Sequence, residues 1–257
     1  MIKFFRKIRF DLMEKNKTGK YLKYAIGEII LVMIGILLAL QVNNWNENRL
    51  NKKTEKNYLS GIVANLDKDI LELKRRISRD TSQLQAQTTI LKSFRAEKIK
   101  NDIPKLVTAI RRFQSITSFS GNNIVFEDMK SSGKINLIVS DTLRFKILDY
   151  YKSFESLKRK ETFNNNITIQ LKDPISMAYL DPNSIYEANY IPDLWKSEVN
   201  KLDLSFFERN PDSPEVTDFA NKISSIKAML LGNHRTKIRL SNEAMELKKY
   251  ILKYIEE

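Results

Sequence analysis

The stretch Tyr24–Val42 reads YAIGEIILVMIGILLALQV and contains the longest apolar run of the chain, Ile29–Leu40, in which Gly35 is the one interruption. As a helix, residues 25–42 would be about 27 Å long, close to the hydrocarbon thickness of a bilayer. Eleven of these residues are Leu, Ile or Val. Together they favour insertion by roughly 5 kcal/mol, which exceeds the roughly 3 kcal/mol cost of one acidic residue. The sequence therefore predicts a transmembrane helix over residues 24–45.

The charges around this helix indicate its orientation. The preceding basic residues are Lys3, Arg6, Lys7, Arg9, Lys15, Lys17, Lys20 and Lys23, whereas Arg49, Lys52, Lys53 and Lys56 follow over a similar distance. Because cytoplasmic flanks carry the excess of Lys and Arg, we expect a cytoplasmic N-terminus and an exported remainder. A buried helix of a soluble protein is the alternative, and these flanks argue against it. A cleaved signal peptide is disfavoured by the acidic residues Asp11 and Glu14 in the basic region.

The composition of the chain limits which kinds of functional site it can form. The chain has 257 residues, no cysteine and one histidine, His234, with seven glycines and six prolines. Disulfides, thiolate nucleophiles and sulfur-ligated metals are therefore excluded, and neither a metal site nor a cofactor is expected. About half of the net charge of +13 lies in the first 23 residues, where membrane topology and anionic lipid account for it, so no nucleic-acid partner is expected. Few Gly and Pro with abundant Leu, Ile, Lys and Glu predict an all-α fold.

Hydrophobic periodicity divides the chain into parts. Residues 1–23 are predicted to be a cytoplasmic basic amphipathic segment, and residues 46–257 an exported, periplasmic helical domain. Within that domain, residues 46–101 and 215–257 show the three-four spacing of long helices, and residues 102–214 are predicted to form a membrane-distal cap of short helices. Gly133 is expected to be a left-handed helix cap, and Asp141 to cap a further helix.

The two long helices are predicted to pair as an antiparallel helical bundle or coiled coil. Asp80 and Gln87 occupy inward positions of the first helix, and Asn233 and Lys237 occupy inward positions of the last. A register with Asp80 opposite Lys237 matches both apolar seams in length. The last helix is expected to be continuous through Gly232-Asn233, with a hairpin there as the alternative.

Small residues mark one face of the membrane helix. Gly35 and Ala39 form a small-x-x-x-small pair, and Gly27 and Glu28 lie about two turns earlier. This spacing lets two helices approach closely, so homo-oligomerisation through these four residues is one possibility. The other is that small residues are simply common in spans. Glu28 is either an intramembrane partner for a basic residue or an acid that reaches the interface beside Lys23.

The segment YAIGEIILVMIGILLALQVNNWNENR, after the basic lead-in MIKFFRKIR, resembles the start of an uncharacterised family of single-span membrane proteins from bacteroidete bacteria. The triplet Gly27-Glu28-Ile29, the exit Asn43–Glu47 and the later stretch FEDMKSSGKINLI at 126–138 carry the resemblance. It implies a bacterial inner membrane as the location and assigns no activity, ligand or catalytic residue.

The expected function is a non-enzymatic scaffold or partner-docking module, with the bilayer and an unidentified protein as partners. A catalytic site needs converging groups with tuned pKa values, and the sequence offers no candidate for one. The docking candidates are aromatic residues of the expected cap: Tyr186, Tyr190, Trp195, Phe206 and Phe207. Core packing is the competing explanation for each of them. A ligand-sensing helical bundle that signals through partner proteins is the alternative function.

Overall fold

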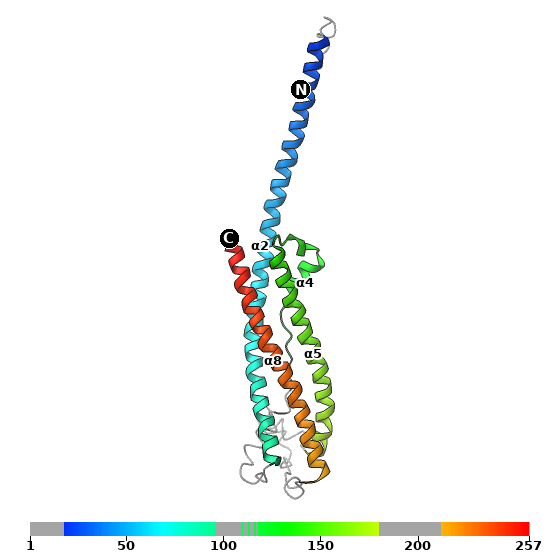
Figure 1. The fold of residues 1–257 in the computed structure, drawn as a ribbon, viewed down its shortest axis with the longest axis vertical. Coiled ribbons are helices and arrows are strands. Elements are labelled where there is room, and N and C mark those ends of the chain that lie inside the picture. The colour runs from blue at the N-terminus through cyan, green and yellow to red at the C-terminus, as the bar shows by residue number, and fades with distance from the viewer. Residues whose placement is uncertain are drawn as a thin grey trace, which may run out of the picture. The chain divides into compact units, whose positions relative to one another are not determined.

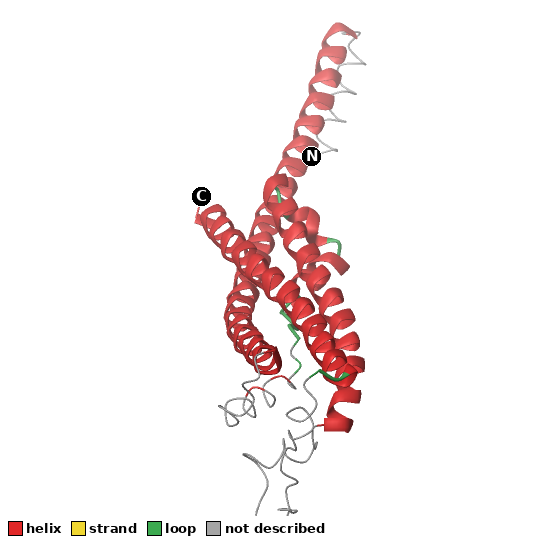
Figure 2. Cartoon of the chain, turned by 60° about the horizontal axis from the view of Figure 1, so that its bottom comes forward, coloured by secondary structure: helices red, strands yellow, loops and turns green. Residues whose placement is uncertain are grey.

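The computed structural model describes residues 18–95, 118–179 and 212–256, together with residues 109, 113 and 116. These residues form helices and a few turns, without a strand among them (Figures 1 and 2). The chain divides into two compact units, residues 1–57 and 58–257. The division falls inside the first helix, twelve residues after the boundary at 45/46 that the sequence predicts.

Helix α2, Thr18–Arg95, is one continuous element of 78 residues. Its N-terminal part is the one described helix that is long and apolar enough to cross a membrane, and the side chains of its most apolar window are not buried inside the protein. Ile29, Leu37 and Leu40, for example, are all more than half exposed. An all-helical chain with an apolar N-terminal helix is thus confirmed.

Two glycines with positive φ flank helix α4, Ile124–Ser131. Gly121 precedes it with φ of 62°, and Gly133 follows it with φ of 69°. Gly133 N donates to the carbonyl of Lys130, which confirms the predicted left-handed cap. A single 3-10 turn, η2, Lys134–Leu137, leads on to the next helix.

Helix α5, Asp141–Tyr179, is 39 residues long. The expected cap of short helices is therefore wrong for this part of the chain, because α5 is a full-length member of the bundle. The inward spacing of Leu143, Ile147 and Tyr150 continues along the helix and buries one side of it. Its N-cap is Ser140, whose hydroxyl accepts from Leu143 N at 3.2 Å, rather than the predicted Asp141.

Helix α8, Pro214–Glu256, runs without a break through Gly232-Asn233, as predicted. Ser213 Oγ accepts from Val216 N, and Pro214 occupies the first helical position, where its missing N–H costs nothing. Asn233 and Lys237 are both buried. The polar layer expected in this helix is therefore present.

The core of the second unit lies among α2, α5 and α8. It contains Leu66 and Leu73 of α2, Phe154 of α5, and Ala244 and Ile251 of α8. Close backbone packing joins α5 to α8, which lie side by side (Figure 1). The predicted contact between Asp80 and Lys237 is present, whereas the antiparallel coiled coil of α2 with α8 remains a prediction.

Candidate functional site

Three buried charged side chains, one from each long helix, meet inside the bundle. Lys237 Nζ of α8 lies 2.7 Å from Asp80 Oδ2 of α2 and 2.8 Å from Glu161 Oε1 of α5. All three side chains are at most 1% exposed. Removing charges from water is costly unless they are paired, so this cluster constrains which residues of the three helices can face one another.

Glu161 also connects the cluster to the chain before α4. Its Oε2 accepts a 2.7 Å hydrogen bond from the backbone N–H of Phe119. The two carboxylate oxygens of Glu161 therefore contact the ammonium of Lys237 and the backbone amide of Phe119. With two carboxylates and one ammonium, Asp80, Glu161 and Lys237 hold one excess negative charge.

His234, one turn before Lys237, faces the same cluster. Its Nδ1 lies 3.9 Å from Asp80 Oδ2, and its side chain is 15% exposed. This distance is too long for a hydrogen bond but close enough for electrostatic attraction when the ring is protonated.

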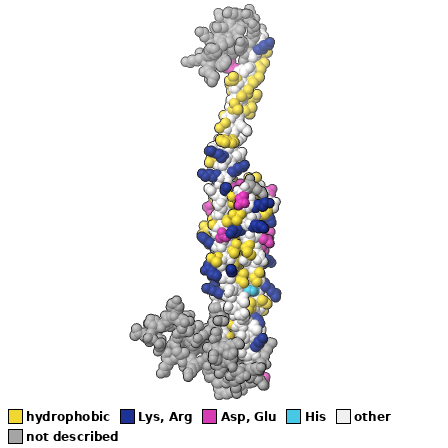
Figure 3. Space-filling view, turned by 90° about the vertical axis from the view of Figure 1, so that its left-hand side faces the viewer, with side chains coloured by type: hydrophobic (Ala, Val, Ile, Leu, Met, Phe, Trp, Pro, Cys, Tyr) yellow, Lys and Arg dark blue, Asp and Glu magenta, His cyan; other side chains and the backbone are white. Residues whose placement is uncertain are grey.

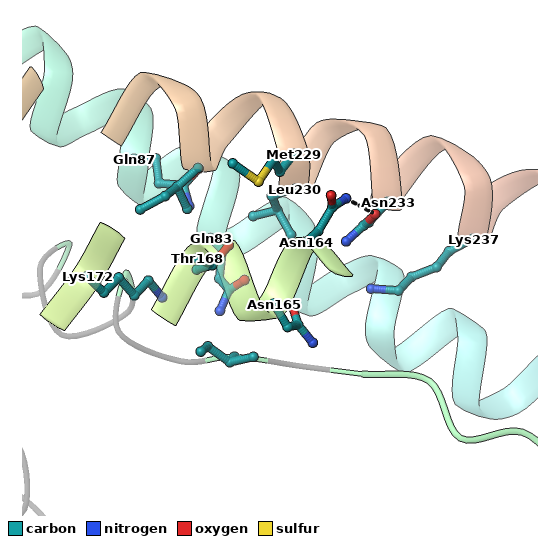
Figure 4. A pocket seen from close by; sticks show the side chains of 12 residues that line it. Gln83, Gln87, Asn164, Asn165, Thr168, Lys172, Met229, Leu230, Asn233 and Lys237 are labelled. Atoms are coloured by element: carbon teal, nitrogen blue, oxygen red, sulfur yellow. Dashed lines mark hydrogen bonds between the residues drawn. The ribbon is translucent and has the colours of Figure 1, made fainter. Parts of the chain in front are cut away.

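A polar cavity of about 30 Å³ adjoins the cluster (Figure 4). Its lining side chains are Gln83 and Gln87 of α2, Asn164, Asn165, Thr168 and Lys172 of α5, and Met229, Leu230, Asn233 and Lys237 of α8, with Ile116 and Ile226. Asn164 Nδ2 donates to Asn233 Oδ1 at 2.8 Å. Gln87 Oε1 is buried without a hydrogen-bond partner among the described residues. A volume of this order admits only about two water molecules.

Lys172 lies at one end of the cavity. Its Nζ donates to the carbonyl of Phe113 at 2.5 Å and lies 4.7 Å from the centre of that residue's ring. Burial lowers the pKa of Lys172 to about 8, because the ammonium is taken out of water.

A further buried carboxylate, that of Asp69 of α2, contacts the turn before α4. Asp69 Oδ1 accepts from Asn122 N at 2.7 Å and from Asn122 Nδ2 at 2.9 Å, and Oδ2 accepts from Tyr150 Oη at 2.9 Å. Burial raises the pKa of Asp69, while these hydrogen bonds act in the opposite direction. The pKa of Tyr150 is raised by its own burial and by the charge of Asp69.

These groups connect segments that are far apart in the chain. Each carboxylate oxygen discussed above lies within 3 Å of an ammonium, hydroxyl or amide group of the bundle. No group of three potential metal ligands occurs among the residues that the structure describes.

The sequence predicted only part of this arrangement. It identified Asp80, Gln87, Asn233 and Lys237 as inward polar residues, and all four line or adjoin the cavity. It missed Glu161, although the spacing Phe154, Leu157, Glu161 continues the inward series of α5. The docking candidates Tyr186, Tyr190, Trp195, Phe206 and Phe207 lie outside the described residues.

The four membrane-helix candidates all lie on α2. At both Gly27 and Gly35, an added Cβ would meet nothing within 4 Å, so the helix leaves this space open to another molecule. Glu28 and Ala39 lie on the same helix, and nothing tests self-association through any of the four.

No curated protein and no solved structure matches the chain. The comparison with protein families matches residues 28–170, more than half of the chain, to DUF6090, described as a family of unknown function. The matched segment covers most of the apolar stretch, α4 and most of α5. On this match, the chain belongs to the DUF6090 family of unknown function.

Proposed function

We propose that this protein is a non-enzymatic, single-pass membrane protein that presents its helical bundle to a protein partner. One observation carries the proposal: a single helix, α2, contains both the exposed apolar stretch and two buried acidic residues of the bundle, Asp69 and Asp80. An apolar helix with exposed side chains requires lipid, and a bundle fixed by buried charges supplies a firm surface for docking.

The proposed orientation has the N-terminus in the cytoplasm and the bundle in the periplasm of a bacterial inner membrane, as in the bacteroidete family that the sequence resembles. The excess of Lys and Arg before the span supports it. Protease treatment of intact spheroplasts tests it: the bundle should be digested from outside. Protection of the bundle until the membrane is lysed would contradict the orientation.

Self-association of the membrane helix is a further part of the proposal. Gly35 has open space around it, so Gly35→Leu changes the surface of the helix without disturbing the described fold. We expect this variant to lose any cross-linked oligomer that the wild-type chain forms in membranes. Gly19→Leu, also in open space on α2, is the matched control and should retain it.

Docking is tested in cells with a photoreactive amino acid at exposed positions of the bundle. Ile124, Phe163 and Met245 are exposed, and Leu157 is fully buried. Trp195, from the expected cap, adds a fifth position. We expect light-dependent adducts with one specific protein at one or more exposed positions and none at Leu157. Absence of protein adducts at all exposed positions would refute the docking role.

A ligand-sensing bundle is the second candidate, and the polar cavity is the observation that favours it. Lys172 and the unpartnered Gln87 Oε1 are groups that a small polar ligand could bind. However, pockets for metabolites typically exceed about 300 Å³, and this cavity is about 30 Å³. Sensing would therefore require the helices to separate, whereas docking uses the bundle as it is folded.

A further inference from the structure

Helix α8 carries an exposed apolar stripe in addition to its buried one. Ile238, Met245 and Leu252 recur at every seventh residue and are 40%, 47% and 40% exposed. A seven-residue spacing places side chains along one side of a helix. The buried series of α8, which includes Ala244 and Ile251, lies on a neighbouring side. The exposed stripe is therefore not an extension of the core.

Helix α2 carries a matching stripe. Val63, Ile70, Ile77 and Leu84 also recur every seven residues and are all half-buried. Val63 and Ile70 pack against the edge of the core cluster and keep part of their surface exposed. This stripe therefore borders the core on one side of α2.

The contacts between the helices bring the two stripes to the same side of the bundle. Lys248 Nζ of α8 lies 2.5 Å from Asp67 Oδ1 of α2. Ile70 follows Asp67 by three residues and Met245 precedes Lys248 by three, so Ile70 and Met245 lie at the same level along the bundle. Val63 precedes Asp67 by four residues and Leu252 follows Lys248 by four, so these two also lie at the same level. One heptad beyond Ile70 and Met245, Ile77 comes level with Ile238.

Helix α5 does not cover this side. It packs on the opposite flank of α8, where Lys160 Nζ donates to the carbonyl of Gly232 and to Thr236 Oγ1. Likewise, α2 meets the turn before α4 through Asp69 and Asn122, away from its stripe. Six residues thus form a two-helix face that is half-buried on α2 and exposed on α8, called the α2/α8 face below: Val63, Ile70, Ile77, Ile238, Met245 and Leu252.

Basic residues border this face. On α8, the residues three positions before Ile238 and Leu252 are Arg235 and Lys249, both exposed. On α2, the residue four positions after Ile70 is the exposed Lys74. Two acidic residues also lie at the border: Asp67, which is paired with Lys248, and Glu256, four positions after Leu252 and exposed. Figure 3 shows hydrophobic side chains along the middle of the bundle, with Lys and Arg side chains and some Asp and Glu side chains around them.

The charges decide between two possible occupants. A second copy of the chain would bring its own Lys74, Arg235 and Lys249 to the interface, and like charges at the flanks of a helical seam disfavour pairing. A helix with acidic flanks would instead meet each of these bases with an opposite charge. Two neighbouring helices with heptad stripes offer the surface that the apolar side of a third helix needs.

We propose that the α2/α8 face binds one amphipathic helix of a partner protein, with an apolar heptad seam flanked by Asp and Glu. The inference rests on the proposed docking function and specifies its surface and the chemistry of the partner. The seam would cover Ile238, Met245 and Leu252, and the acidic flanks would lie along Lys74 and Lys249.

The test uses the full-length chain in lipid nanodiscs and a fluorescent four-heptad peptide with Leu and Ile in the seam and Glu at the flanks. We expect saturable binding by fluorescence anisotropy at low salt, beyond that to empty nanodiscs. Met245→Glu should weaken binding at least tenfold, because it places a charge in the seam. Phe163→Glu, an equivalent change at an exposed apolar residue of α5, is the matched control and should not weaken it.

A second peptide with Lys at the flanks measures the charge requirement, and we expect it to bind at least tenfold more weakly. The proposal is overturned if Met245→Glu leaves binding unchanged or if both peptides bind equally. It is also overturned if the wild-type chain forms a dimer that Met245→Glu abolishes, because a second copy would then cover the face. Photo-adducts that persist after Met245→Glu would overturn this face alone. Absence of adducts at every exposed position of the chain without this substitution would also refute docking.

Discussion

Lys237 Nζ donates a 2.7 Å hydrogen bond to Asp80 Oδ2, between residues that are 157 positions apart in the chain. Glu161 Oε1 lies 2.8 Å from the same ammonium, so one lysine serves two carboxylates inside the bundle. The cluster therefore has two acidic side chains and one basic side chain, so replacing the lysine should lower the stability of the fold more than replacing one acid.

Lys237→Met should destabilise the protein far more than Asp80→Asn. The first variant leaves two buried carboxylates without their ammonium, which typically costs about 3–5 kcal/mol. The second leaves Lys237 paired with Glu161 and retains an oxygen that can accept a hydrogen bond, so about 1 kcal/mol is expected. Thermal unfolding of the full-length chain in detergent, followed by circular dichroism, measures both. Equal losses of stability in the two variants would contradict the pairing of one ammonium with two carboxylates.

Gly121→Ala should be strongly destabilising, whereas Gly133→Ala should not. Both glycines have positive φ, which costs an alanine about 1 kcal/mol. At Gly121 an added Cβ would also lie 1.8 Å from Phe154 Cε2, whereas at Gly133 it meets nothing within 4 Å. Forcing atoms into a packed core adds roughly 1–3 kcal/mol. The difference in melting temperature between the two variants isolates the steric part, and similar melting temperatures would contradict the close approach of Phe154.

Lys172→Met should stabilise the protein at pH 7 and lose this advantage by about pH 10.5. Burial lowers the folded-state pKa of Lys172 to about 8, whereas the unfolded value is about 10.4. The unfolded chain therefore binds more protons between these values, and wild-type stability rises with pH across that window. Below pH 8 the full penalty applies, about 3 kcal/mol from the pKa difference. Unfolding of both proteins from pH 7 to 10.5 checks this, and a constant difference between them would contradict it.

Cysteines replacing Leu66 and Ile251 should be joined within one chain by a short bifunctional thiol reagent. Both residues are fully buried in the same core cluster, and the chain contains no other cysteine. Lys68→Cys with Ile251→Cys is the control, because Lys68 lies at nearly the same level on the exposed side of α2. Gel mobility before and after reduction of a cleavable reagent distinguishes the products. Cross-links that form only between chains would contradict the register of Asp80 with Lys237.

Local spacing was sufficient to predict the first and last long helices, α2 and α8, and the buried side of α8. The inward positions of Asp80 and Lys237 follow from a three-four repeat that sequence alone contains. The third helix was underestimated because Asp141–Tyr179 includes Pro174 and several Asn residues, which weaken a local helix prediction. Helix α5 packs beside α8 because Phe154 and Leu157 are buried against residues that are distant in sequence. A local sequence pattern does not reveal such contacts.

The candidate site was less predictable for a related reason. Glu161 occupies an inward position of α5, but an acidic residue on a charged helix is ordinarily solvated. Its burial is explained only by the backbone N–H of Phe119 and the ammonium of Lys237, which come from two other segments. The low pKa of Lys172 likewise depends on neighbours rather than on its own sequence context.

The segment that matches the DUF6090 family, residues 28–170, contains Asp80 and Glu161 but ends before Lys237. The counterion for both acids therefore comes from outside the matched segment. Expressed alone, that region would keep two carboxylates in an interior that lacks their cation, together with core residues such as Leu66 and Phe154 deprived of α8. Family membership and autonomous folding thus have different boundaries in this chain, and the smallest piece that folds must extend to the C-terminal helix.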